Sequence, residues 1–157
     1  MKKKEIAMFG AGCFWGVEET FRKLPGVIKT ESGYAGGDYK NPSYRDVCTD
    51  LTGHAEVVRI EFDPKKISYE ELLKVFWDVH NPTQLNRQGP DIGNQYRSVI
   101  FYFDNEQKKK AKESMKKEQK EYKEKIVTEI VHESKFYKAE EYHQRYLMKQ
   151  GLESCSV

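Results

Sequence analysis

The order in which strand-like and helix-like patterns follow one another constrains the fold of this chain most. In the stretch 55–62, apolar and charged side chains alternate, which is typical of a strand with one buried face. Shortly after it, Ser68 and Glu71 form the S-x-x-E capping-box pattern, and apolar residues follow at helical spacing up to Val79. One strand and one helix are therefore fixed before any other segment is assigned.

The remaining elements are predicted from apolar runs and turn residues. Strands are expected at 6–9, 27–34, 99–103 and 126–131, and helices at 15–24, 105–125 and 139–150. The first strand should break at Gly10-Ala11-Gly12, and long polar loops should follow 27–34 and occupy 81–93. The order strand, helix, strand, strand, helix, strand predicts an α+β fold. We expect a two-layer sandwich with a split βαβ (ferredoxin-like) core.

Length and charge limit the domain count and the kinds of partner. A chain of 157 residues fits one domain, which we place at 1–150 as the catalytic domain, with a flexible tail at 151–157. A net charge of +2 gives no field that favours nucleic acid, and the lysine-rich helix interleaves its lysines with glutamates. No apolar run approaches the roughly 18 residues of a membrane helix. A monomer without nucleic-acid or membrane partners is expected.

The three cysteines point to a reducing compartment. Cys13, Cys48 and Cys155 are odd in number and widely separated, unlike the paired cysteines of a small secreted scaffold. The basic and then apolar start of the chain is shorter than the roughly 15 to 30 residues of a secretory signal. A cytoplasmic location is therefore expected. Because neither C-x-x-C nor H-E-x-x-H occurs, we expect no metal and no cofactor.

Cys13 is the candidate nucleophile. It lies where a strand gives way to a helix, so backbone N–H groups and the helix dipole would stabilise its thiolate. A small buried core cysteine is the ordinary alternative. The glycines Gly10, Gly12 and Gly16, with Glu31 further on, also suggest a nucleotide-binding turn, but bulky residues occupy the position where a pyrophosphate must touch backbone amides.

Five short motifs occur in order between residues 6 and 146. They are Gly12-Cys13-Phe14-Trp15-Gly16, Gly33-Tyr34-Ala35-Gly36-Gly37, Asn41-Pro42-Ser43-Tyr44, Thr52-Gly53-His54-Ala55-Glu56 and Asp91-Ile92-Gly93-Asn94-Gln95-Tyr96-Arg97-Ser98. Together they resemble the peptide methionine sulfoxide reductase A family, which reduces methionine-S-sulfoxide. The joint occurrence is far more specific than any single motif. The resemblance implies thiol-dependent reduction of free and protein-bound methionine sulfoxide.

The resemblance assigns chemical roles to these residues. Cys13 would attack the sulfoxide sulfur, and Glu56 would protonate the departing oxygen, since burial among apolar neighbours should raise the pKa of its carboxyl. An exposed strand residue is the ordinary interpretation of Glu56 alone.

The other implied roles concern the oxygen and the methyl group of the substrate. Tyr44 and Tyr96 would hold the sulfoxide oxygen, and Asp91 would organise the polar side of the site through water. Phe14 and Trp15 would enclose the S-methyl group.

The catalytic cycle needs a second thiol to resolve the sulfenic acid left on Cys13. Cys155 is the expected resolving cysteine and Cys48 the alternative, although the tail has one glycine where relatives have several. Thioredoxin is the implied reductant. Two other functions stay open: a hydrolase that pairs Cys13 with His54, and a redox sensor or methionine-binding module without turnover.

Overall fold

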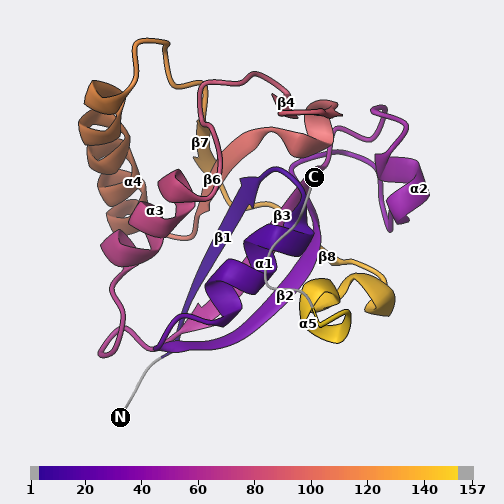
Figure 1. Ribbon diagram of the computed structural model, residues 1–157, viewed down its shortest axis with the longest axis horizontal. Helices are drawn as coiled ribbons and strands as arrows, with labels where there is room; N and C mark the ends of the chain where they lie inside the picture. The colour runs from indigo at the N-terminus through magenta and orange to yellow at the C-terminus, as the bar shows by residue number, and fades with distance from the viewer. Residues whose placement is uncertain (1–3, 152–157) are drawn as a thin grey trace.

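The computed structural model describes residues 4–151, which form a mixed α+β fold around a six-stranded sheet (Figure 1). The strands are β1 (Glu5–Ala11), β2 (Val27–Ala35), β3 (Ala55–Phe62), β4 (Arg87–Gln88), β5 (Asp91–Ile92), β6 (Ser98–Tyr102), β7 (Glu129–His132) and β8 (Tyr137–Lys138). The α-helices are α1 (Phe14–Arg22), α2 (Tyr44–Val47), α3 (Tyr69–Asp78), α4 (Asn105–Glu118) and α5 (Tyr146–Lys149). Short 3-10 helices are η1 (Asn94–Tyr96), η2 (Gln119–Glu121) and η3 (Glu141–His143).

The strand directions gather distant segments at one edge of the sheet. The order is β7-β6-β1-β3-β2-β8, and β1 runs antiparallel to both β3 and β6. The end of β1 at Ala11 therefore lies opposite Ser98, the start of β6, while Ala35 at the end of β2 lies opposite Ala55, the start of β3. The turn after β1, the loop between β2 and β3 and the loop before β6 consequently meet at this edge.

The two faces of the sheet are covered differently. One face carries α1, α3 and α4 over the main core, in which the Phe9 ring lies 5.5 Å from that of Phe21 and 5.1 Å from that of Phe76. The opposite face forms a smaller cluster that includes Val57 and is covered in part by Phe136. Figure 1 shows α1 crossing in front of the central strands, with α3 and α4 beside it.

The alternating strand and the capped helix lie where the sequence predicts them. β3 spans 55–62 with its apolar side chains buried, and Ser68 caps α3 by accepting the backbone N–H of Glu71, whose carboxylate accepts the backbone N–H of Ser68. β1 ends at Ala11, within the break predicted at Gly10-Ala11-Gly12, but it extends two residues beyond Phe9, where the strand was expected to end. A Cβ at Gly10 would lie 2.7 Å from a methyl carbon of Val99, so the glycine permits close strand contact rather than a turn.

Two predictions near the C-terminus are corrected. The strand expected at 126–131 is β7, which begins at Glu129 rather than at Ile126. The side chain of Ile126 is buried in the main core. The helix expected over 139–150 is replaced by η3 and the four-residue α5. Arg145 has φ 51° and ψ 43°, a left-handed conformation that a continuous helix excludes, and its backbone N–H donates to the Glu18 carboxylate at 2.7 Å.

Several short elements lie within stretches that the sequence predicts as loops. α2, with a capping box between Ser43 and Asp46, lies between β2 and β3, and β4, β5 and η1 lie before β6. Tertiary contacts hold them, as when Asn94 donates its backbone N–H to the Asp50 carboxylate at 2.7 Å. Elements this short have no hydrophobic period to reveal them.

Candidate active site

Cys13 lies at the N-terminal end of α1, at the edge of the sheet where the loops meet. It is the N-cap residue of this helix and is partly buried. Gly12 before it has φ +95°, a conformation that side chains rarely adopt, so the turn from β1 into α1 depends on glycine there. The thiol therefore stands at the positive end of the helix dipole, where a thiolate is stabilised.

Glu56 is buried directly beside this turn. Its side chain is 1% exposed, and Oε1 accepts the backbone N–H of Phe14, the residue after Cys13, at 3.3 Å. Burial raises the pKa of the Glu56 carboxyl to about 7, with a further contribution from the charge of Asp91. Hydrogen bonds from Gln95 and the Phe14 amide oppose this rise. At neutral pH the carboxyl is consequently divided between its acid and its base forms.

Gln95 is a residue of the site that we did not single out from the sequence. It is buried, and its Nε2 donates to Glu56 Oε2 at 2.8 Å. The same nitrogen lies 3.5 Å from the sulfur of Cys48, an exposed thiol. Its place inside the Asp91–Ser98 motif was the only signal, and that signal did not separate it from its neighbours. Gln95 thus connects the buried carboxyl to the alternative resolving cysteine.

Tyr44, Tyr96 and Asp91 lie close enough to Glu56 for charges within this group to shift the pKa values of Glu56 and of both tyrosines. Burial raises the pKa of both tyrosines, and the charge of Glu56 adds to the rise in each. The charge of Asp91 also raises the pKa of Tyr96. Both hydroxyls therefore remain protonated at neutral pH and can donate hydrogen bonds. The structure thus brings Tyr44 of α2 close to the same carboxyl as Tyr96 of η1 and Asp91 of β5, although Tyr44 lies far from both in the sequence.

The two aromatic residues after Cys13 have different surroundings. Phe14 is 1% exposed and packs in the main core, with its ring centre 5.8 Å from that of Tyr34 and 6.5 Å from that of Tyr44. Trp15 is partly buried and stacks on Tyr146 of α5, with 3.9 Å between ring centres and an interplanar angle of 11°. Of the two rings, Trp15 therefore offers more aromatic surface to a ligand.

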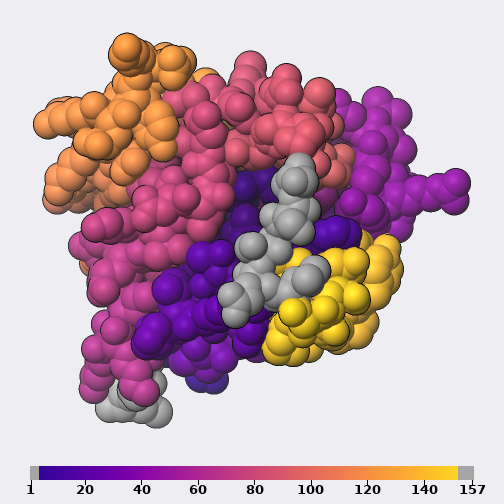
Figure 2. All heavy atoms as spheres, in the orientation of Figure 1, coloured from indigo at the N-terminus to yellow at the C-terminus, as the bar shows by residue number. Residues whose placement is uncertain are grey.

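A groove opens beside Cys13. It encloses about 510 Å³ and is bordered by α1, by the segment around His80 after α3, and by the β4–β5 hairpin. Cys13 and Asp91 both line it. Figure 2 shows the face of the molecule on which the indigo surface of α1 lies next to the yellow C-terminal segment. The groove therefore reaches Cys13 between α1 and the β4–β5 hairpin, whereas the other site residues are not among those that line it, namely Phe14, Trp15, Tyr44, Glu56 and Tyr96.

The two competing interpretations of Cys13 lack the necessary geometry. His54 cannot serve as a base for Cys13, since its Nδ1 accepts the N–H of Gly37 at 3.0 Å and its Nε2 lies 2.7 Å from the carbonyl oxygen of Tyr39. Both ring nitrogens are thus engaged with the backbone. A nucleotide phosphate would need the first amides of α1, but the Phe14 N–H already points to Glu56.

Among residues 4–151, no group of three or more His, Cys, Asp and Glu could hold a metal ion. No helix in the same range is long and apolar enough to cross a bilayer. Cys155, the expected resolving cysteine, lies outside the described residues.

A cysteine at the N-cap position of a helix, beside a buried and partly protonated carboxyl, is the arrangement of a cysteine-dependent enzyme that couples thiol attack to proton transfer. The model of the peptide methionine sulfoxide reductase family matches residues 5–157. Peptide methionine sulfoxide reductase A2-1 of Oryza sativa subsp. japonica is 60% identical over 147 residues, covering 94% of this chain and 79% of that protein. The chain belongs to the peptide methionine sulfoxide reductase family and is an oxidoreductase.

Solved structures agree with this assignment. Methionine sulfoxide reductase A of Corynebacterium diphtheriae superimposes with a TM-score of 0.92 at 37% identity, covering 97% of this chain and 77% of that one. Mxr1 of Saccharomyces cerevisiae in complex with Trx2 superimposes with a TM-score of 0.66 at 25% identity, covering 92% of this chain and 85% of that one. The mixed α+β fold is therefore that of methionine sulfoxide reductases.

Proposed function

We propose that this protein reduces methionine-S-sulfoxide, free or within oxidised proteins, to methionine. The observation that carries the proposal is the position of Glu56, whose Oε1 accepts the amide N–H of the residue next to Cys13 while burial raises its pKa to about 7. A sulfoxide sulfur is electrophilic only while its oxygen is being protonated, so a thiolate and an acid must act on it together.

In the proposed first step, the Cys13 thiolate attacks the sulfoxide sulfur and Glu56 transfers its proton to the sulfoxide oxygen. Oxygen transfer then leaves Cys13 as a sulfenic acid and releases methionine, so the cysteine is oxidised by two electrons and the sulfoxide is reduced by two. Tyr44 and Tyr96 donate hydrogen bonds to the oxygen, and Asp91 orders water on the polar side.

Substrate binding is assigned to the aromatic residues of α1. Trp15, which is partly buried and next to Cys13, would contact the S-methyl group on its indole face. Phe14, which is buried, would close the pocket behind it. Sulfur–aromatic contacts contribute about 0.3–1.5 kcal/mol each, enough to orient the methyl group without holding the product tightly.

In the second step, another thiol condenses with the sulfenic acid, forming a disulfide and releasing water. We propose Cys155 for this role, with Cys48 as the alternative. Gln95, which lies between the Cys48 sulfur and Glu56, supports the alternative, since it brings Cys48 into the surroundings of the acid. Thioredoxin is the proposed reductant of the disulfide, supported by the complex of the relative Mxr1 with Trx2.

The remaining proposals concern organisation and location. The antiparallel neighbours β6-β1-β3-β2 and the helices α1 and α3 that connect them support a split βαβ (ferredoxin-like) core in a two-layer sandwich. We also propose a single catalytic domain at 1–150 with a tail at 151–157. The protein would work as a monomer without a cofactor. A cytoplasmic location is supported by its three widely separated cysteines, which do not form the paired pattern of a secreted scaffold.

The test uses racemic methionine sulfoxide with dithiothreitol as the electron donor. We expect half of the substrate, the S epimer, to be consumed and the other half to remain, as measured by chiral chromatography. Consumption of both epimers or of neither would contradict the proposal. Cleavage of an ester or amide would favour the hydrolase, and saturable binding without product would favour the binding module.

A matched pair of variants separates the two candidate resolving thiols. Cys155→Ser should keep its dithiothreitol-driven activity and lose thioredoxin-driven turnover, whereas Cys48→Ser should keep both. The reverse result would transfer the role to Cys48. Mass spectrometry of the enzyme after one turnover would show directly which sulfurs are joined.

A further inference from the structure

His143 lies at the centre of the aromatic residues around the site, although it is 130 positions after Cys13 in the sequence. It ends η3 and is 1% exposed. Its ring centre lies 5.1 Å from that of Phe14, 5.8 Å from that of Trp15 and 4.5 Å from that of Tyr44. Three residues with proposed substrate roles therefore touch or approach this one imidazole.

One hydrogen bond joins His143 to Trp15. The indole Nε1–H donates to His143 Nδ1 at 2.9 Å, so Nδ1 is an acceptor and the ring is neutral with its proton on Nε2. Within residues 4–151, Nε2 is buried without a hydrogen-bond partner. A buried donor left unsatisfied costs about 1–3 kcal/mol, and such sites in native structures call for an explanation in function or strain. The ring is therefore held in place through its acceptor side.

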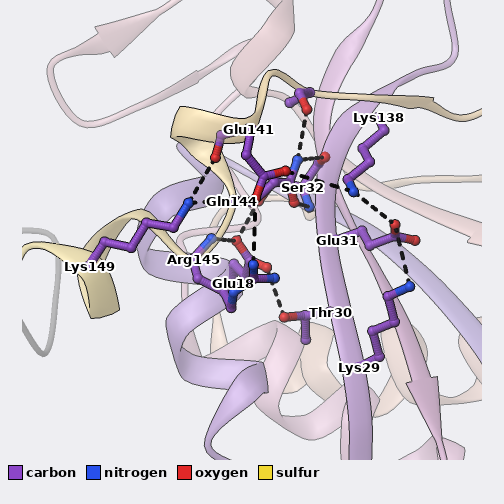
Figure 3. Close-up of polar contacts among 11 residues, drawn as sticks. Glu18, Lys29, Thr30, Glu31, Ser32, Lys138, Glu141, Gln144, Arg145 and Lys149 are labelled. Carbon is purple, nitrogen blue, oxygen red and sulfur yellow. Dashed lines mark hydrogen bonds and ion pairs between the residues drawn. The ribbon is translucent and has the colours of Figure 1, made fainter.

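The residues after His143 fix its backbone to α1 and β2 through buried polar contacts (Figure 3). Gln144 accepts the backbone N–H of Ser32 at 2.8 Å and donates from Nε2 to the Ser32 carbonyl oxygen at 2.8 Å. Glu18 of α1 accepts the backbone N–H of Arg145 and the hydroxyl of Ser32. Because Gln144 and Glu18 are both at most 1% exposed, these contacts are shielded from water.

Stacking alone does not determine the orientation of the Trp15 ring. Tyr146 covers one face of the indole almost in parallel, and a stacked ring can still turn within its own plane. The hydrogen bond to His143 removes this freedom, because it fixes the direction of the indole N–H. An aromatic surface that is set before the ligand arrives binds more tightly than one that must be ordered on binding.

We propose that His143 is a positioning residue, which fixes the rotation of the Trp15 indole within its stacked plane by accepting its N–H and thereby sets the affinity of the site for the S-methyl end of the substrate. This inference rests on the proposed function, specifically on contact between Trp15 and the substrate. It assigns no contact with the substrate to His143 itself.

The test compares His143→Asn with His143→Leu. The two replacements have nearly the same shape, and the amide oxygen of Asn can occupy the position of Nδ1, whereas Leu has no acceptor. Removing a hydrogen bond worth about 1.4 kcal/mol changes affinity tenfold. His143→Leu should therefore raise KM for a methionine sulfoxide peptide about tenfold and leave kcat within about twofold, while His143→Asn should stay close to the wild type.

Nuclear magnetic resonance supplies a readout that does not depend on activity. The chain has two tryptophans, so its ¹⁵N spectrum should show two indole N–H signals, and Trp15→Phe identifies the one that belongs to Trp15. This signal should keep its position and its slow exchange with water in His143→Asn. In His143→Leu it should move and exchange faster, while the signal of Trp77, which donates to Ser114, stays in place.

Several outcomes would overturn the proposal. An unchanged Trp15 signal and KM in His143→Leu would show that the hydrogen bond does not position the indole. Equal loss in both variants would show that the ring matters only by packing. If His143→Leu does not fold, His143→Gln takes its place. The amide oxygen of Gln lies farther from the backbone than Nδ1 of His143, so it should not accept the Trp15 N–H in the same position. If the wild type reduces no sulfoxide, the proposed function fails, whereas the indole signals still test the hydrogen bond.

Discussion

Glu18 and Glu56, the two glutamates in residues 4–151 with at most 1% exposure, differ in the number and length of the hydrogen bonds that they accept. Glu18 is 0% exposed and accepts three hydrogen bonds, from Thr30, Ser32 and the backbone of Arg145, at 2.7–2.9 Å. Glu56 is 1% exposed and accepts one short bond from Gln95 at 2.8 Å and one longer bond from the Phe14 amide at 3.3 Å.

The comparison shows how one residue type serves structure in one region and chemistry in another. Hydrogen bonds to a carboxylate favour its charged form, whereas burial favours its neutral form. Around Glu18 the donors tie α1, β2 and the C-terminal segment together. Around Glu56 burial exceeds the effect of the donors, and the pKa rises to about 7. A buried carboxyl with few donors is thus suited to release a proton.

The largest expected effect is the loss of catalysis in Glu56→Gln. General acid catalysis contributes about a hundredfold to ten-thousandfold, so kcat/KM for the S-sulfoxide should fall within that range. Glu18→Gln is the matched control and should keep kcat/KM per folded molecule within a few-fold. Dithiothreitol-driven reduction of one epimer measures both. A similar loss of kcat/KM in the two variants would contradict the assignment of a catalytic role to Glu56 and a structural role to Glu18.

The second prediction concerns stability and pH. The pKa of Glu56 is 4.5 in the unfolded chain and about 7 in the folded protein. Its contribution to stability is fully present below pH 4.5 and is lost as pH rises through about 7, because the unfolded chain gives up the proton first. By pH 8.5 the loss should reach about 3 kcal/mol. Glu56→Gln should remove this pH dependence and be more stable than the wild type at pH 8.5, as measured by urea unfolding.

The third prediction applies the same substitution to Glu18. A glutamine offers one acceptor oxygen, and its NH₂ group would face a donor, so at least one of the three buried hydrogen bonds is lost. The free energy of unfolding should fall by about 1–3 kcal/mol at both pH 6 and pH 8.5. At pH 8.5, therefore, Glu56→Gln should raise the free energy of unfolding and Glu18→Gln should lower it. A stabilising Glu18→Gln would contradict this account of its contacts.

The smallest effect is expected for Gln95→Met, which keeps the length of the side chain and removes the donor. The Gln95 hydrogen bond lowers the pKa of Glu56, so its removal should raise that pKa further. The pH above which kcat/KM declines should move upward by about one unit. A pH–rate profile under single-turnover conditions measures the shift. A downward shift would mean that Gln95 does not stabilise the charged carboxylate.

Local patterns predicted the elements that depend on nearby residues. The alternation in β3, the Ser68–Glu71 capping box of α3 and the position of Cys13 before α1 all follow from interactions within a few residues. The short motifs also predicted the family, which the comparisons confirm. Contacts over long sequence distances were not predicted, and for this reason Gln95 and His143 were not singled out.

The sequence by itself determined the nucleophile's place at a helix start and most of the strands and helices, because hydrophobic period and capping are local properties. Only the tertiary structure decided the rest. Antiparallel pairing of β1 with β3 and β6 brings Cys13, Glu56 and Gln95 to one edge, and buried contacts to Glu18 break the expected C-terminal helix at Arg145. These outcomes depend on which donors and acceptors, distant in sequence, pair with one another where they are buried from water. No local sequence pattern contains that information.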